Sequence, residues 1–214
     1  MKKTALILAR GGSKGIPNKN IIDLNKKPLI AYTILEAQKS TVDEVWVSTN
    51  CKKIKEVAER YGASVLDRPD KYATDSSKSE ESLIHFAQTI DFDILVFIQP
   101  TSPLIKACDI NSGLKMMQDK NYDSVFSAYK EHWLPRWTLD RLPDNWEVNN
   151  RPMRQDVDEK FVENGAFYIT SKEALLTSNL RYSGNIGILE MPLSRSFQID
   201  TEDDLLLIKD LINE

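Results

Sequence analysis

The sequence predicts an α/β fold in which a mostly parallel sheet is covered by helices on both faces. Through residue 128, short apolar runs alternate with amphipathic stretches of helical length. Such alternation is typical of strands joined by right-handed helical crossovers. In addition, glycine-rich or polar loops follow several of the apolar runs, and ligands bind such sheets beyond the carboxyl ends of the strands.

The first elements follow from apolar spacing. The run at 5–9 is short and fully apolar, which favours a buried strand. Apolar residues at helical spacing predict a helix at 29–39. The run at 45–49 predicts the second strand, and the charged amphipathic stretch at 53–61 predicts a helix that ends at Gly62.

The central part of the chain continues this pattern. We expect a short strand at 64–66, a polar loop at 67–78 and a helix at 82–90. The apolar run at 94–98 predicts another buried strand, which Pro100 and Pro103 end. A helix at 109–120 and a strand at 124–128 complete the alternation.

The pattern changes after residue 128. Residues 130–160 are rich in Trp, Arg, Pro, Asp and Asn without helical periodicity, which favours an insertion or a protruding arm. Strands are expected again at 165–169 and 186–191, and an amphipathic helix at 201–212. Because 214 residues suit one globular unit, we expect a single domain, 1–214, with an arm of approximately 130–162 inserted within it.

Composition excludes several classes of protein. The chain is 41% hydrophobic and 28% charged, with a formal net charge of -4, and a nucleic-acid binder would normally show a basic stripe. Cys51 and Cys108 lack metal or redox spacing and fit a reducing cytosol. The first apolar run stops at Arg10, too early for a signal peptide, and no run approaches the roughly 18–20 residues of a transmembrane helix. We expect a cytoplasmic protein that binds neither nucleic acid nor membrane.

The loop at 10–20 is the strongest candidate for a binding site. It follows the first strand and contains three glycines, which allow backbone N–H groups to approach phosphate oxygens closely. Arg10, Lys14 and Lys19 provide three cations, as neutralisation of a triphosphate requires. A glycine-rich surface turn with solvated lysines is the structural alternative.

Two common phosphate loops do not fit this spacing. The P-loop requires Lys-Ser or Lys-Thr after its second glycine, whereas Gly15 is followed by Ile16 and Pro17. The dinucleotide fingerprint requires a third glycine that opens a helix, whereas here the loop continues. The loop by itself therefore predicts polyphosphate binding at a strand end.

The run LARGGSKGIPNKN at 8–20 resembles the signature of the acylneuraminate cytidylyltransferases, also called CMP-sialic acid synthetases. The resemblance extends over essentially the whole chain in the expected order. It includes KPLI at 27–30, WVST at 46–49, DSSKS at 75–79, QPTSP at 99–103 and NGAFY at 164–168. It implies a Rossmann-like nucleotidyltransferase domain, and an arm that reaches a partner subunit in a homodimer with completed sites.

The resemblance also implies how the nucleotide is held. Lys14 would lie nearest the α-phosphate and stabilise its developing charge, and Lys14, Arg10 and Asp200 would be catalytic. Ser79 would lie near the cytosine or ribose, although the loop at 75–79 also fits a polar helix cap. The expected nucleotide-binding residues are Ala9, Arg10, Gly11, Gly12, Ser13, Lys14, Lys19, Asn20 and Ser79.

The resemblance places the sugar on the other side of the site. A fork-shaped guanidinium suits the sugar's carboxylate, and Arg154 is the closest motif match, with Arg136 and Arg151 as weaker candidates. Many bacterial members carry an arginine where this chain has Val162. The turn at 99–103 also fits a purely structural proline turn. The expected substrate-binding residues are Gln99, Thr101, Arg154, Gln155, Asn164 and Tyr168.

The metal site departs from the family pattern. Members of the family usually carry Asp-Ile-Asp before the last helix, and both carboxylates hold Mg²⁺. Here Asp200 matches the second aspartate and Gln198 replaces the first. One carboxylate plus substrate phosphates suffices for Mg²⁺ in many sites, with an amide oxygen as a weaker ligand. Asp200 and its acidic neighbours also fit a cap of the last helix.

Other conspicuous residues have simpler interpretations. His85 falls within a helix and fits a packed or surface histidine. His132 lies in the arm near motifs of the site, and the sequence leaves open whether it contacts the substrate. Trp133, Trp137 and Trp146 suit an intersubunit contact better than stacking on a ligand.

The sequence thus predicts transfer of CMP from CTP to the anomeric hydroxyl of a sialic-acid-type nonulosonate, with release of pyrophosphate. The same chemistry on legionaminate, pseudaminate or ketodeoxynonulosonate is the alternative. A protein that binds nucleotide sugars without catalysis is an alternative of another class, motivated by Gln198.

Overall fold

A seven-stranded sheet forms the centre of the molecule in the computed structural model, which describes residues 1–13 and 15–213. The strands lie in the order β5-β4-β1-β6-β8-β7-β9. β8 runs antiparallel to β6 and β7, and every other neighbouring pair in this order is parallel, which confirms the mostly parallel sheet. The strands are β1 Lys3–Leu8, β4 Glu44–Thr49, β5 Ser64–Asp67, β6 Ile94–Ile98, β7 Ser124–Glu131, β8 Lys160–Ser171 and β9 Ile186–Glu190.

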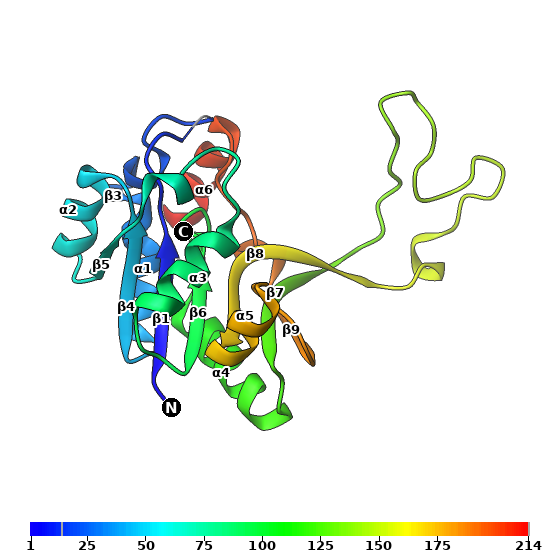
Figure 1. Ribbon diagram of the computed structural model, residues 1–214. Coiled ribbons are helices and arrows are strands. Elements are labelled where there is room, and N and C mark those ends of the chain that lie inside the picture. Colours follow the sequence, from blue (N-terminus) through cyan, green and yellow to red (C-terminus); the bar gives the residue numbers. More distant parts are fainter. Residues whose placement is uncertain (14, 214) are drawn as a thin grey trace.

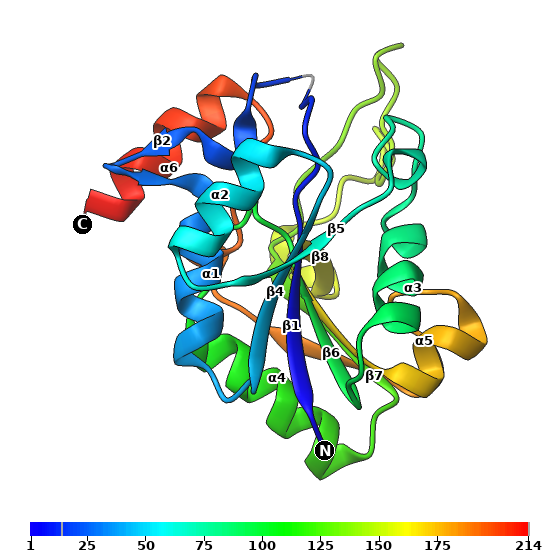
Figure 2. The ribbon, with the colours of Figure 1, turned by 60° about the vertical axis from the view of Figure 1, so that its left-hand side comes forward.

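Helices cover both faces of the sheet (Figures 1 and 2). Successive strand residues point to opposite faces, so Ala5 and Ile7 of β1 pack under one helical layer and Leu6 under the other. The first layer holds α1 Leu29–Lys39, α2 Lys52–Arg60 and α4 Ala107–Lys120, and the second holds α3 Ser79–Thr89 and α5 Lys172–Ser178. The last helix, α6 Glu202–Asn213, packs through Leu205 and Ile208 on a smaller apolar cluster.

The order of the strands creates a switch point beside β1. The chain moves outward from β1 to β4 and β5, and then returns through α3 to β6 on the other side of β1. The loops that follow β1 and β6 therefore lie beside each other at the carboxyl edge of the sheet, where sheets of this kind bind ligands. The loop at 10–20 and the turn at 99–103 both start at this edge.

A short hairpin and a short helix were missing from the prediction. Asn25 and Lys26 both have positive φ, at 51° and 69°, and form a two-residue turn between β2 Asp23–Leu24 and β3 Lys27–Pro28. The seven-residue α5 follows β8 directly, with Ser171 capping its first turn. Both are shorter than the windows over which hydrophobic periodicity is informative.

The arm is a structural feature of the chain. β7 and β8 pair beyond the body of the sheet as far as Glu131 and Lys160, and residues 132–159 extend away from it (Figure 1). Within the arm, a short 3-10 turn at Arg154–Asp156 and isolated bridges replace regular elements. Its exposed apolar side chains include Leu134, Trp137, Leu139, Leu142, Val148 and Met153.

Across the described residues, every helix is too short or too polar to span a bilayer.

Candidate active site

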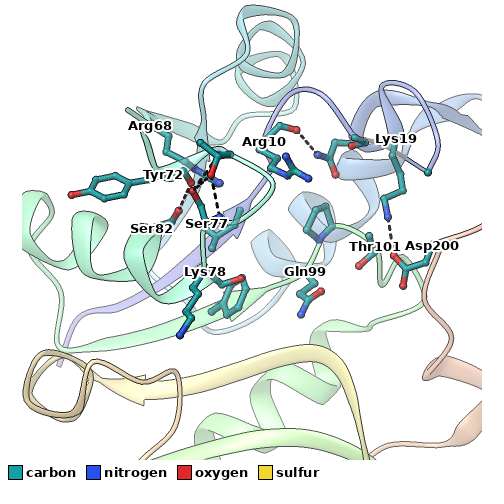
Figure 3. A pocket seen from close by; sticks show the side chains of 18 residues that line it. Arg10, Lys19, Arg68, Tyr72, Ser77, Lys78, Ser82, Gln99, Thr101 and Asp200 are labelled. Carbon is teal, nitrogen blue, oxygen red and sulfur yellow. Dashed lines mark hydrogen bonds and ion pairs between the residues drawn. The ribbon is translucent and has the colours of Figure 1, made fainter. Parts of the chain in front are cut away.

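The main cavity lies at the switch point, over the carboxyl ends of β1 and β6, and has a volume of about 410 Å³. Its walls come from the loop after β1, the segment after β5, the first turn of α3 and the turn after β6 (Figure 3). The lining residues used below are Arg10, Ser13, Gly15, Lys19, Asn20, Arg68, Lys78, Ser79, Gln99, Thr101 and Asp200.

Two asparagines hold the loop after β1, Asn50 from outside the cavity and Asn20 from its wall. The N–H of Gly11 donates to Asn50 Oδ1 at 2.9 Å, and Asn20 Nδ2 donates to the carbonyl of Arg10 at 3.0 Å. Gly12 has φ +71°, a conformation that favours glycine and turns the loop. The loop is therefore a built structure rather than a solvated surface turn.

Several expected nucleotide-binding residues support the loop instead of lining the cavity. Ala9 is fully buried in the core, and its N–H donates to the carbonyl of Ser48. Gly11 and Gly12 contribute backbone behind the lining residues, whereas Ser13, Lys19 and Asn20 do line the cavity. Lys14 lies outside the described residues.

Two of the expected cations are held by carboxylates across the cavity. Arg10 pairs with Asp75 at 2.8 Å, which ties the first loop to the segment before α3. Lys19 pairs with Asp200 at 2.8 Å and also donates to the carbonyl of Ile199 at 3.0 Å (Figure 3). These two ion pairs bring together the loop after β1, the segment before α3 and the segment before α6, which are far apart in the sequence.

Arg68 is a third cation of this cavity, and the sequence did not single it out. It is 7% exposed, and its Nε and Nη2 donate to the hydroxyl and carbonyl of Ser48, at 3.1 and 2.5 Å. Burial, and then the nearby charge of Arg10, lower the pKa of Arg68 to about 10. It is still charged at neutral pH, and no described carboxylate offsets that charge. Such a group favours an anionic ligand.

The turn after β6 supplies unused hydroxyl groups. Thr101 accepts a backbone hydrogen bond from Ile199 at 2.9 Å, so the turn is fixed to the segment that carries Asp200. The hydroxyls of Thr101 and Ser102 are buried and have no hydrogen-bond partner among the described residues. Buried polar groups normally find partners, so the Thr101 hydroxyl at the cavity wall fits a contact to ligand.

The segment at 75–79 begins a helix and lines the cavity at the same time. α3 begins at Ser79, three residues before the predicted start, and the N–H of Lys78 donates to the carboxylate of Glu81 at 3.0 Å. Ser79 is the first helical residue, so its hydroxyl does not form the cap. The capping interpretation and the nucleotide prediction are therefore compatible.

A second pocket adjoins the first through Gln99, which lines both. It lies against Asn164 and Gly165, where a bulge with positive φ at Gly165 turns β8, and against the segment before α6. Its described lining residues include the carboxylates Glu163 and Asp204 but neither lysine nor arginine. The other lining residues are Tyr129, Val162, Tyr168, Ser196, Phe197 and Gln198.

Tyr168 forms the buried side of the second pocket. Its ring stacks on Phe97 at 5.5 Å, and the guanidinium of Arg181 lies 5.0 Å from the ring centre on a cation–π contact. Its hydroxyl donates to Glu163. Burial and this carboxylate raise the pKa of Tyr168 well above its ordinary value, so the hydroxyl stays protonated.

The side chain of Asn164 is engaged within the fold. Its Oδ1 accepts from the Ser127 hydroxyl at 2.6 Å and from the N–H of Ala166 at 3.1 Å, and its Nδ2 donates to Ser196 at 2.9 Å. The amide thus joins β7, β8 and the segment before α6, and it shapes the pocket rather than projecting into it.

The two expected metal ligands face different pockets. Asp200 lines the main cavity, where it is paired with Lys19, and Gln198 lines the second pocket. Among the described residues, no three His, Cys, Asp or Glu side chains gather as a metal site. One carboxylate in a cavity that is also lined by cations would fit Mg²⁺ held mainly by phosphate oxygens of a ligand and by water.

The arm residues lie apart from both pockets. Arg154 and Gln155 line a separate depression with His132 and Trp133 at the base of the arm. Trp137 and Trp146 pack edge to face at 5.0 Å, and Arg151 covers the Trp146 ring at 5.3 Å. His85 packs against Tyr72, as expected of a packed histidine. In one chain, Arg154, expected to bind the sugar's carboxylate, is not brought to the second pocket.

The sequence matches the family model described as cytidylyltransferase over residues 4–211. The chain belongs to this family. N-acylneuraminate cytidylyltransferase B of Danio rerio is 39% identical over 210 residues, which are 94% of this chain and 49% of that protein. An N-acylneuraminate cytidylyltransferase of Streptococcus agalactiae is 31% identical and matches 96% of this chain and 52% of its own length. The chain therefore spans about half the length of these relatives.

A relative of similar length is a post-translational flagellin modification protein B of Campylobacter coli, 27% identical over 97% of this chain and 94% of that protein. Two solved structures share the fold. A CMP:2-keto-3-deoxy-manno-octonic acid synthetase complexed with CTP superposes with a TM-score of 0.76 at 19% identity, over 100% of this chain and 99% of that one. A 4-diphosphocytidyl-2C-methyl-D-erythritol synthase from Anaerococcus prevotii has a TM-score of 0.70 at 13% identity, with the same coverage. The nucleotidyltransferase fold is confirmed.

Proposed function

We propose that the chain transfers CMP from CTP to the anomeric hydroxyl of a sialic-acid-type nonulosonate. The observation that carries this proposal is the pair of adjoining pockets, one lined by cations and the other by neutral and acidic groups, with Gln99 between them. The names of the relatives support cytidylyl transfer to an acylneuraminate.

The main cavity would hold CTP. Arg10, Lys19 and Arg68 converge on it, and a triphosphate would supply the negative charge that buried Arg68 lacks. Ser79 and Lys78 also line this cavity, and the cytosine or ribose would fit beside them. Charge that develops on the α-phosphate would then meet preorganised cations in a partly closed cavity.

In the reaction, the sugar's anomeric oxygen forms a bond to the α-phosphorus. The bond from that phosphorus to the oxygen bridging to the β-phosphate breaks, and pyrophosphate leaves with the electron pair. The hydroxyl proton passes to a base or to solvent. The second pocket would hold the sugar beside Gln99, so that the hydroxyl faces the α-phosphate.

Magnesium is part of the proposal. Asp200 would hold the ion together with phosphate oxygens of CTP, and Lys19 would keep the carboxylate oriented toward the cavity. The ion would neutralise phosphate charge during the transfer. We also propose a cytoplasmic location, which agrees with the free thiols of Cys51 and Cys108.

The carboxylate of the sugar requires a cation that the second pocket lacks among its described residues. Arg154 is the candidate, yet in a single chain it lies in the arm. The exposed apolar side chains of the arm suit contact with a second copy. We therefore propose a homodimer in which the arm of each subunit brings Arg154 and Gln155 to the acceptor pocket of the other.

The decisive experiment measures Mg²⁺-dependent release of pyrophosphate from CTP with N-acetylneuraminate, legionaminate, pseudaminate and ketodeoxynonulosonate. We expect turnover with at least one, and fastest with N-acetylneuraminate. No turnover with any of them, combined with tight binding of a CMP-sugar, would support binding without catalysis. Turnover only with GTP or UTP would contradict the nucleotide assignment.

A further inference from the structure

The amide of Gln198 makes a contact that the metal interpretation does not require. Its Nε2 donates to the backbone carbonyl of Asn164 at 2.5 Å. A carbonyl oxygen only accepts, so the NH₂ end of the amide must face it. The contact joins the segment before α6 to the turn in β8, across 34 residues of sequence.

The backbone at Gly165 makes room for this amide. Gly165 has φ +65°, and a Cβ built on it would collide with Nε2 of Gln198 and lie 3.4 Å from Nε2 of Gln99. A glycine is therefore needed for two reasons, its left-handed backbone and the close approach of the two amides. The position of the Gln198 amide therefore depends on the absence of a side chain at Gly165.

The contact fixes a turn that shapes the second pocket. The side chain of Asn164 already bonds to Ser127 and Ser196, and its carbonyl receives Gln198. The turn is thus held from β7 on one side and from the segment before α6 on the other. Gln99, the residue shared by the two pockets, lies against the same glycine.

An aspartate at position 198 could not make this contact. A carboxylate is shorter and only accepts hydrogen bonds, so it would face the Asn164 carbonyl with like partial charge. In addition, Gln198 and the metal candidate Asp200 line different pockets.

From these contacts we infer that Gln198 is a positioning residue for the acceptor pocket and not a ligand to the metal. The inference rests on the proposed function for the identity of the acceptor. In this chain the carboxylate of Asp200 would then hold the metal without help from position 198.

The test compares Gln198→Glu and Gln198→Met with the parent chain. Glutamate keeps the length of the side chain and offers the metal a carboxylate, whereas methionine only removes the hydrogen bond. We expect both variants to raise the KM for the nonulosonate about tenfold. We expect the KM for CTP and the Mg²⁺ concentration for half-maximal rate to stay within about twofold. The control is Gln118→Met on the exposed surface of α4.

A second readout does not depend on turnover. Mn²⁺ affinity in the presence of CTP is measured by electron paramagnetic resonance for each chain, and thermal unfolding shows whether each variant folds. A positioning role leaves this affinity unchanged in both variants. Tighter Mn²⁺ binding by Gln198→Glu, or weaker binding by Gln198→Met, would overturn the inference. If the parent turns over no nonulosonate, the proposed function fails, but the Mn²⁺ comparison still decides whether Gln198 is a ligand.

Discussion

At the scale of single residues, Arg68 carries a buried charge that no described carboxylate offsets. Its hydrogen bonds to Ser48 satisfy part of the guanidinium, but burial and Arg10 both oppose its charge. A bound polyphosphate would raise the pKa of Arg68, because a nearby anion favours the protonated form. Stability of the free protein and affinity for nucleotide should therefore respond differently to loss of this residue.

The replacement Arg68→Met tests this expectation. Charge-assisted hydrogen bonds contribute about 1.5–3 kcal/mol, so we expect the KM for CTP to rise about 10- to 100-fold. The free protein should lose little thermal stability, since removal of an uncompensated buried charge offsets the lost bonds to Ser48. Arg60→Met on the exposed surface of α2 is the control. An unchanged KM for CTP would contradict a role in nucleotide binding.

Asp200 is the second residue whose role is testable alone. Replacement by asparagine keeps the shape and removes the charge that faces Lys19. If Asp200 holds the metal, the Mg²⁺ concentration for half-maximal rate should rise about tenfold or more. Asp203→Asn, on the exposed first turn of α6, should leave it unchanged. Equal Mg²⁺ dependence in the two variants would remove Asp200 from the metal site.

At the scale of elements, an ion pair ties the first turn of α3 to Arg181, which also contacts Tyr168 of the second pocket. Glu80 accepts from Nε and Nη2 of Arg181 at 2.7 and 3.2 Å, and the same guanidinium lies over the Tyr168 ring. Burial by itself would raise the pKa of Glu80, but the bonds from Arg181 lower it below the ordinary value of 4.5. The pair therefore stabilises α3 against the segment after α5 only while the carboxylate is ionised.

Glu80→Gln should reveal this pair through pH. A folded-state pKa below 4.5 means that the stability from Glu80 is fully present above pH 4.5 and is lost as pH falls through the lowered pKa. We expect the variant to unfold more easily by about 1–3 kcal/mol at neutral pH, with the difference shrinking in acid. Urea unfolding at a series of pH values measures it, and Glu56→Gln on α2 is the surface control. A difference independent of pH would refute the charged pair as its source.

At the scale of the whole molecule, the proposed dimer would complete each site through the arm. The arm exposes Leu139 fully and Trp137 by more than half, and it carries Arg154, the residue proposed to bind the sugar's carboxylate. A partner subunit would cover these apolar side chains, and its acceptor pocket would use Arg154. Two-fold symmetry would then place two identical shared sites in one dimer.

Complementation between subunits tests the shared site. Arg154→Ala damages the arm, and Arg68→Met damages the cavity, so each homodimer should be impaired. Mixed dimers would contain one intact site, built from the cavity of one chain and the arm of the other. After random exchange we expect about a quarter of the parent activity. Activity no higher than that of the separate variants, or a monomer by light scattering, would contradict the shared site.

Much of this molecule follows from local sequence. Strands such as 94–98 and helices such as 29–39 lie close to their predicted positions, because apolar periodicity reports directly on burial. The placement of the site also follows from the sequence, since the loop at 10–20 and the turn at 99–103 both follow strands that meet at one edge. α5 and the turn at Asn25 and Lys26 were missed, because elements this short have no periodicity to detect.

What the sequence by itself determined was the fold class, the family and the position of a glycine-rich loop at the carboxyl edge of the sheet. Those depend on residue type, spacing and order along the chain. Tertiary packing alone decided that Arg68 is buried beside Arg10, that Gln198 faces Asn164 rather than Asp200, and that Arg154 stands apart in the arm. The physical reason is that burial and hydrogen-bond partners are set by segments far apart in sequence, whereas periodicity and turn chemistry are set by neighbours.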